Sequence, residues 1–301
     1  MENILLRSLL FVPGNRPDRI DKAFGAGADA VIIDLEDAVP ISEKERARQF
    51  AKEKAEQYSS EPVFVRINGL GTQFCAADIE AVVRKGLKGL MVPKVETPED
   101  IDKAHELLAD AEHKAGLKPG TISLIPLIES AAGVQNIYQI LKSPSSSGRA
   151  IIVAFGAADY TLDLGIEMTL EGTELIYPRS RIAVACRAAG FPAPIDSPFM
   201  IDIRNIEALR ADAMRARQLG FQGKLLIHPI QVGPCNEIFS PSKAELEMAR
   251  NIVQAFESGL ATGSGAIQLD GKFIDEPIVK RARQLVAMAS KIDKKEDKRE
   301  R

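Results

Sequence analysis

The chain has 301 residues, of which 45% are hydrophobic, and 39 basic against 42 acidic residues give a formal net charge of −3. This length can bury one large core or two modest ones. No basic segment interleaved with aromatic residues marks a polyanion-binding surface, so we expect no nucleic-acid partner. Three cysteines, Cys75, Cys186 and Cys235, are widely separated and lack metal-ligand spacing, which predicts reduced thiols.

The N-terminal stretch is apolar, but it is short and is interrupted by Arg7 and Pro13. It therefore does not fit a signal peptide. No other run approaches the roughly 18 apolar residues that a membrane-spanning helix needs. We expect a soluble, cytoplasmic protein with no membrane partner.

Short apolar runs, most of them rich in β-branched residues, recur up to residue 229. Continuous rather than alternating apolar runs are typical of buried parallel strands. The first run is less regular, and the seventh is the weakest because it carries three prolines. The predicted strands are 6–14, 28–37, 62–69, 89–95, 123–130, 150–159, 192–198 and 223–229.

Helical patterns separate these runs, at 16–27, 42–58, 97–116, 171–190 and 205–220. Ser42 is the expected N-cap of the second, with Glu45 three residues later. Thr97 caps the third, with Pro98 at its first position. Pro178 is expected to break or kink the fourth.

Alternating strands and helices predict an α/β fold, a (β/α)8 TIM barrel formed by residues 1–239. A doubly wound open sheet is the alternative, but the chain lacks the Gly-x-Gly-x-x-Gly turn that would favour a dinucleotide fold. Residues 240–301 are predicted to form a C-terminal helical and hairpin extension, a candidate lid. It comprises a helix (242–263), a hairpin turning at 270–271, a second helix (277–293) and a solvated, frayed tail.

Two consecutive predicted strands end on carboxylates, Glu129 and Asp159. Active sites of such barrels lie at the C-terminal ends of the strands, and neighbouring strands are about 4.8 Å apart. Two carboxylates there could share one hard divalent cation, with water and substrate oxygens completing its shell. The pattern favours a Mg²⁺ site. The alternative is that each acid only caps the helix that follows it.

The second predicted strand ends in an acidic cluster, Asp34, Glu36 and Asp37, and the third ends on Arg66. The acids would repel one another unless a cation lay close by, so Glu36 and Asp37 are expected around the metal, in contact with it through bound water. Arg66 could bind a substrate carboxylate through two hydrogen bonds. An ion pair between Arg66 and the acidic cluster fits the pattern equally well.

Two further residues end predicted strands, Lys94 on the fourth and His228 on the eighth. A Schiff-base lysine would make the protein a metal-free aldolase, but the acids that support a metal site disfavour this chemistry. His228 could line the mouth of the barrel either as a catalytic group or as a structural hydrogen-bonding one. No Ser/His/Asp or Cys/His set can be assembled.

A series of motifs in a fixed order resembles one known family. They are RSLLFVPGNRPDRIDKA, DLEDAV, FVRING, LIPLIESAAGV, FGAADYTLDLG, EGTELIYPRSRIAVACRAAG, LGFQGKLLIHPIQV and GAIQLDGKFIDEP. Together they look like the beta subunit of citrate lyase and its stand-alone relatives in the HpcH/HpaI aldolase superfamily, which include malyl-CoA and citramalyl-CoA lyases. The resemblance covers nearly all of residues 5–290.

This resemblance implies a Mg²⁺-dependent lyase that cleaves a citryl-, citramalyl- or malyl-type 3-hydroxyacyl thioester. The products would be an acetyl-thioester and a 2-oxoacid. Glu129 and Asp159 match the family's metal ligands, Arg66 its carboxylate-binding arginine, and Asp275 of the lid motif its acid–base aspartate, which reaches a neighbouring subunit's site. The region of the thioester carrier would include Phe11, Arg19 and Lys22.

Several alternatives stay open. A malyl-CoA-type thioesterase could use the same site, and a metal-dependent aldolase could act on free hydroxy-oxoacids. A non-catalytic subunit of a lyase complex would predict a broken set of acids, which this chain does not have. The carrier could be CoA or an acyl-carrier protein, and the chain could belong to a citrate lyase complex. A lid acting on a neighbouring subunit predicts a homotrimer or a multiple of it.

Overall fold

The computed structural model describes residues 4–261, 266–269 and 272–299. Two compact units divide the chain, Met1–Asn236 and Glu237–Arg301. Within the described ranges, every helix is too short or too polar to cross a membrane.

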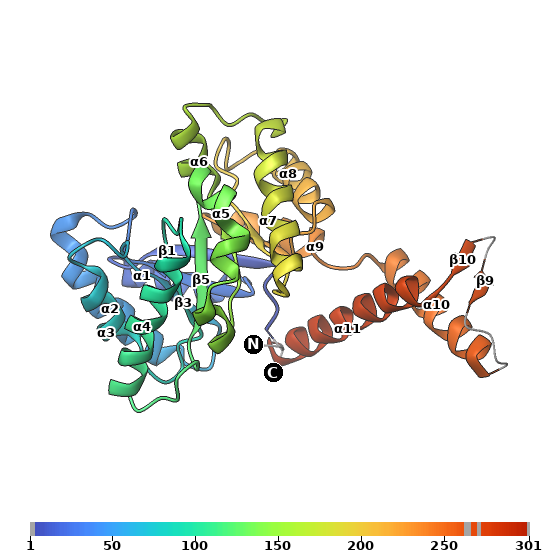
Figure 1. Cartoon of the computed structure of the whole chain (residues 1–301), viewed down its shortest axis with the longest axis horizontal. Coiled ribbons are helices and arrows are strands. Elements are labelled where there is room, and N and C mark those ends of the chain that lie inside the picture. The colour runs from blue at the N-terminus through green and yellow to red at the C-terminus, as the bar shows by residue number, and fades with distance from the viewer. Residues whose placement is uncertain (1–3, 262–265, 270–271, 300–301) are drawn as a thin grey trace. The chain divides into compact units, whose positions relative to one another are not determined.

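The first unit is a closed barrel of eight parallel strands that pair in chain order, with β8 closing against β1. Its helices lie outside the strands (Figure 1). The predicted (β/α)8 fold is confirmed, and every predicted strand region contains one strand. The strands are β1 (Ser8–Pro13), β2 (Ala30–Asp34), β3 (Val63–Arg66), β4 (Gly89–Val92), β5 (Ser123–Ile128), β6 (Ala154–Phe155), β7 (Ile195–Asp196) and β8 (Gly223–Leu226).

All five predicted helices of the barrel region are present, together with further helices that the patterns did not single out. Four 3₁₀ turns add to these: η1 (Ile41–Glu43), η2 (Pro144–Gly148), η3 (Thr173–Leu175) and η4 (Pro229–Gln231). The α-helices are α1 (Pro17–Gly25), α2 (Lys44–Gln57), α3 (Cys75–Val82), α4 (Pro98–Lys114), α5 (Ala131–Leu141), α6 (Ala157–Leu164), α7 (Ile176–Ala189), α8 (Ile206–Gln218) and α9 (Val232–Ile238).

Two details of the predicted helices are wrong. Ser42 does not cap α2, because it lies inside the 3₁₀ turn η1 and Glu43 occupies the N-cap position. Pro178 does not kink α7, because it is the third residue of that helix, where the missing amide costs no intrahelical hydrogen bond. Thr97 does precede α4, and its amide donates to Asp100 Oδ2 at 2.9 Å.

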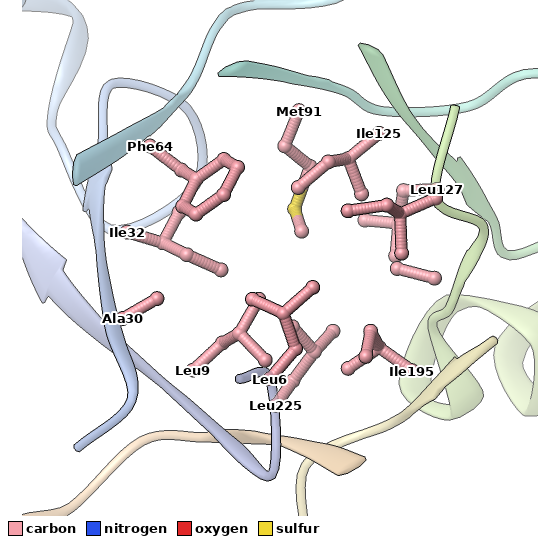
Figure 2. Packing of buried hydrophobic residues seen from close by; sticks show 12 residues of the cluster. Leu6, Leu9, Ala30, Ile32, Phe64, Met91, Ile125, Leu127, Ile195 and Leu225 are labelled. Atoms are coloured by element: carbon pink, nitrogen blue, oxygen red, sulfur yellow. The ribbon is translucent and has the colours of Figure 1, made fainter. Parts of the chain in front are cut away.

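Apolar side chains fill the barrel interior (Figure 2). They come from alternate positions of the strands, as the pleat of a β-strand requires. Leu9 and Ala30 pair across β1 and β2, and Ile32 and Phe64 pair across β2 and β3. The interior is a packed core rather than a pore, so any site must lie above it, at one end of the barrel.

The second unit contains α10 (Lys243–Ala261), a two-stranded antiparallel hairpin of β9 (Ile267–Leu269) and β10 (Lys272–Ile274), and α11 (Glu276–Arg299). Phe256 of α10, Ile274 of β10 and Val279 of α11 form its small core. Figure 1 shows α10 beside α11. The expected turn at 270–271 lies outside the described residues. The prediction of a frayed tail is wrong for residues 294–299, because α11 continues through this charged segment.

A buried ionic network joins the last two strands to the helices that cover them. Lys224 of β8 donates to Asp196 of β7 and to Asp212 of α8, at 2.6 Å for Asp212 Oδ2. Arg179 of α7 donates to Asp196 Oδ1 at 2.9 Å and to Asp212 Oδ1 at 2.8 Å. All four side chains are buried, so each charge depends on the others for its solvation.

We predict that Lys224→Met destabilises the protein by about 3 kcal/mol, because the buried carboxylates of Asp196 and Asp212 would then keep Arg179 and, for Asp212 alone, the part-exposed Arg215 at 3.6 Å. Urea denaturation followed by circular dichroism measures the effect. Lys118→Met at an exposed position is the control and should change stability by no more than about 0.5 kcal/mol. Equal midpoints for both variants would contradict a structural role for the network.

Candidate active site at the C-terminal end of the barrel

A cavity of about 450 Å³ opens at the C-terminal ends of the barrel strands. This is the end at which (β/α)8 enzymes carry their active sites. The lining combines acidic, aromatic and aliphatic side chains with one arginine. The lining residues are Phe11, Val12, Pro13, Asp34, Asp37, Ala38, Arg66, Leu127, Glu129, Gly156, Ala157, Ala158, Asp159, Pro198, Met200, Leu225 and Ile227.

Strand alternation explains why the polar residues gather here. A side chain two positions beyond an interior residue points to the same face of its strand. Four interior residues are therefore each followed, two positions later, by a residue that lines the cavity: Ile32 by Asp34, Phe64 by Arg66, Leu127 by Glu129 and Ala154 by Gly156. The apolar core thus ends and the polar site begins within one step of the pleat.

Glu129, directly after β5, is the most unusual group in the cavity. It is only 3% exposed, and its Oε1 accepts a hydrogen bond of 2.8 Å from the backbone amide of Lys94. Burial, followed by the negative charges of Asp159 and Glu36, raises the pKa of Glu129 to about 8. A carboxylate in this environment is stabilised by a cation placed between it and Asp159.

Gly156 makes room for the Glu129 carboxylate. A Cβ on Gly156 would lie 2.7 Å from both Cβ and Oε2 of Glu129, closer than real contacts allow. The glycine is therefore required by close approach, and not by its backbone angles.

Asp159 does not end the sixth strand as predicted. β6 stops at Phe155, and α6 begins at Ala157, so Asp159 lies in the first turn of that helix. The apolar run 150–159 is a strand followed by a helix start, which periodicity cannot distinguish from one longer strand. The half-buried side chain still lines the cavity with Glu129, so the two acids do come together.

Lys94 follows β4 in a strained conformation, with φ of 55°, alone among the described non-glycine residues in having positive φ. This conformation aims its amide at Glu129, while its Nζ lies 3.3 Å from Glu36 Oε1. Lys94 is not among the residues that line the cavity. Its contribution is to hold Glu129 through the main chain, and strain of this kind is typical of functional sites.

Arg66 is fixed by the acidic cluster. Its Nε and Nη2 donate to the two oxygens of Asp34 at 2.7 and 2.6 Å, and its Nη1 lies 3.0 Å from Glu36 Oε2. Burial alone would lower the pKa of Arg66, but Asp34, Glu36 and Asp37 together raise it above its usual value. The ion pair left open by the sequence is therefore formed, and the Nε–Nη2 edge is already used.

The buried Lys44 also lies beside the acidic cluster, and the sequence patterns did not predict this position. Lys44 donates through Nζ to the carbonyl oxygens of Leu35 and Glu36, at 2.7 and 2.6 Å. Glu36 is buried beside Arg66 and does not line the cavity, and burial is the main cause that raises its pKa. Asp37, in contrast, is exposed and lines the cavity.

The donor set fits a hard divalent ion that keeps open positions. In the described ranges, no three His, Cys, Asp or Glu side chains form a cluster that could enclose a metal. Two carboxylates that face one cavity, Glu129 and Asp159, are the oxygen ligands that Mg²⁺ accepts when water or substrate supplies the rest.

The other residues singled out from the sequence are Phe11, Arg19, Lys22, His228 and Asp275. Phe11 lines the cavity, and its ring lies 5.0 Å from the guanidinium carbon of Arg66. Arg19 and Lys22 lie exposed on α1 and do not line it. His228 is exposed and caps η4, with its Nδ1 accepting from the Ile230 amide at 3.2 Å. Asp275, half-buried, directly precedes α11 in the second unit.

Residues 7–229 match the HpcH/HpaI aldolase/citrate lyase family. The citrate lyase subunit beta of Leuconostoc mesenteroides subsp. cremoris is 38% identical over 288 residues, which cover 95% of this chain and 94% of that protein. A (3S)-malyl-CoA thioesterase of Cereibacter sphaeroides is 33% identical, with 95% of each chain covered.

A solved structure gives the same result. The protein CitE from Mycobacterium tuberculosis, crystallised with magnesium, acetoacetate and coenzyme A, superposes with a TM-score of 0.74 at 29% identity. The match covers 94% of this chain and 97% of that one. Sequence and fold agree, and this chain belongs to the HpcH/HpaI aldolase/citrate lyase family.

Proposed function

We propose that the protein is a Mg²⁺-dependent carbon–carbon lyase that cleaves a 3-hydroxyacyl thioester to an acetyl-thioester and a 2-oxoacid. The observation that carries this proposal is the buried Glu129 carboxylate, which together with Asp159 lines a cavity at the C-terminal end of the barrel. The magnesium of the CitE relative and the citrate lyase and thioesterase relatives support it.

Glu129 and Asp159 are the proposed ligands of the ion. When bound, Mg²⁺ would polarise the oxygen that becomes the ketone of the 2-oxoacid. The Lys94 amide and the space beside Gly156 hold the Glu129 carboxylate in place before any ion arrives. Such preorganisation lowers the cost of assembling the site.

Arg66 is the proposed group for the substrate carboxylate. Asp34 fixes the Nε–Nη2 edge, so the contact would involve Nη1, which now lies near Glu36 and Asp37. The substrate would therefore compete with these two acids for the same face of the guanidinium. The ring of Phe11 covers the guanidinium and limits its movement.

The reaction needs one proton removed and one delivered. The hydroxyl proton leaves, the adjacent carbon–carbon bond breaks, and its electron pair forms the enolate of the acetyl-thioester, which is then protonated at carbon. Asp275 is the proposed acid–base group for one of these transfers. The thioester carbonyl stabilises the enolate, so no lysine is needed.

The carrier would be CoA or an acyl-carrier protein, and the region of Arg19 and Lys22 is its proposed contact surface. The proposed assembly is a cytoplasmic homotrimer or a multiple of it, alone or within a citrate lyase complex, with Asp275 serving a neighbouring subunit. The malyl-CoA thioesterase relative favours a second candidate, hydrolysis at the same site. Release of free CoA without a 2-oxoacid would identify that activity.

Gly156→Ala should weaken Mg²⁺ binding by roughly tenfold or more, because the added methyl displaces the Glu129 carboxylate. Isothermal titration calorimetry with Mg²⁺ measures this directly. Gly25→Ala is the matched control, since nothing lies within 4 Å of a Cβ at Gly25. Unchanged affinity in the Gly156 variant would argue against Glu129 as a ligand.

Asp275→Asn should reduce turnover of a 3-hydroxyacyl-CoA by at least about 100-fold while leaving substrate binding unchanged, because the amide cannot transfer the proton. Release of 2-oxoacid, coupled to a dehydrogenase, measures turnover, and calorimetry measures binding. Glu276→Gln, at the next and exposed residue, is the control. Full activity in the Asp275 variant would remove this residue from the mechanism.

Mixing two inactive variants tests the shared site. If Asp275 serves a neighbouring barrel, Glu129→Gln and Asp275→Asn subunits, dissociated and reassembled together, should regain part of the wild-type activity. Each variant reassembled alone should stay inactive. A mixture that forms hybrid oligomers, as shown by native mass spectrometry, but stays inactive would mean that both residues act within one chain.

A further inference from the structure

Acidic and aliphatic side chains both line the cavity. Asp34, Asp37, Glu129 and Asp159 lie among its acidic and polar groups. Pro198, Met200, Leu225 and Ile227, from the segments that follow β7 and end β8, form a wall without charge. A ligand chelated by Glu129 and Asp159 can place its remaining substituent against these aliphatic side chains or turn it towards the opening.

The supply of positive charge in the cavity is small. Among the lining residues, all within the described part of the chain, Arg66 is the only cationic side chain. Its guanidinium already contacts Asp34, Glu36 and Asp37. With a divalent ion bound and all four lining carboxylates ionised, the lining and the ion together carry one net negative charge.

The three thioester types differ at a single position, the substituent on the hydroxyl-bearing carbon. It is hydrogen in the malyl type, methyl in the citramalyl type and carboxymethyl in the citryl type. Methyl or hydrogen can rest against aliphatic side chains, since burial of apolar surface is favourable. A second carboxylate would lose hydration in a negative cavity without gaining a cationic partner, which is unfavourable.

We infer that the acid product of this site is a 2-oxoacid with one carboxylate and a small apolar substituent, of the pyruvate or glyoxylate class, and not a dicarboxylic 2-oxoacid such as oxaloacetate. This inference rests on the proposed function, because it assumes that the cavity holds the acid half of the substrate. It assigns Met200 and its neighbours on the aliphatic wall as specificity-determining residues.

The test measures binding and turnover separately, with the full-length protein in Mg²⁺. Calorimetry with pyruvate, glyoxylate and oxaloacetate should show that pyruvate or glyoxylate binds at least roughly tenfold more tightly than oxaloacetate. The values of kcat/KM for citramalyl-, malyl- and citryl-CoA should follow the same order. A matched pair of variants tests the wall itself.

Met200→Arg places a cation on the half-buried wall position, and it should shift the binding ratio towards oxaloacetate by roughly tenfold or more. Met200→Leu keeps the wall apolar, so its ratio should stay close to that of the wild-type protein. Circular dichroism verifies that both variants are folded. A folded Met200→Arg protein with an unchanged ratio would overturn the role of the wall.

Different outcomes would overturn the inference about the 2-oxoacid and the proposed lyase function. Mg²⁺-dependent cleavage with citryl-CoA equal to or better than the other thioesters would overturn this inference and leave the proposed lyase function intact. If oxaloacetate binds the wild-type protein as tightly as pyruvate, the inference is also overturned. If no thioester is cleaved and no 2-oxoacid shows Mg²⁺-dependent binding, the proposed function is overturned together with the inference.

Discussion

The cavity depends on one carboxylate that is held out of water. Glu129 is buried at the end of β5, and burial together with Asp159 and Glu36 raises its pKa to about 8. Ionising such a group at pH 7 costs free energy, and the surrounding fold must tolerate this cost or supply a positive charge. The neighbouring cations, Lys94 and Arg66, are both committed to Glu36 and the acidic cluster. The arrangement is consistent with a site whose missing charge arrives with a ligand.

The pleat of the barrel strands links this carboxylate to the hydrophobic core. The same alternation that buries Ile32, Phe64 and Leu127 in the interior places Asp34, Arg66 and Glu129 one step higher. Core packing therefore determines where the polar groups emerge, and a one-residue shift in register would turn them away from the cavity. Fold stability and site geometry are consequences of one pattern.

Much of this could be predicted from the sequence, because long apolar runs and their terminal polar residues are strong signals. The eight strands, the barrel and the gathering of Glu129, Asp159 and Arg66 at one end follow from that reasoning. The start of α6 could not be located, because the apolar run 150–159 continues from strand into helix without a change in character. Gly156, between strand and helix, was the one signal of close backbone approach.

The sequence patterns could not predict contacts between segments that are far apart in the chain. Nothing in the local sequence shows that Lys94 adopts positive φ to direct its amide at Glu129, or that Lys44 reaches the carbonyls of Leu35 and Glu36. Both depend on how the ends of neighbouring strands and the start of α2 meet in three dimensions. Arg19 and Lys22 show the converse, since basic residues near a site in sequence lie on the exposed side of α1.

Asp34 connects the structural and chemical roles of the site. It accepts both hydrogen bonds of the Arg66 edge, and it also accepts from the amides of Glu36 and Ala38 at 2.9 and 3.1 Å. One carboxylate thus fixes both the arginine and the loop that carries Glu36 and Asp37. Because the guanidinium cannot turn without breaking these bonds, the position of Nη1 is set before any substrate binds. A substrate carboxylate that meets Arg66 would displace Glu36 and Asp37 from one face while Asp34 keeps the other, so the arginine would change partners without changing place.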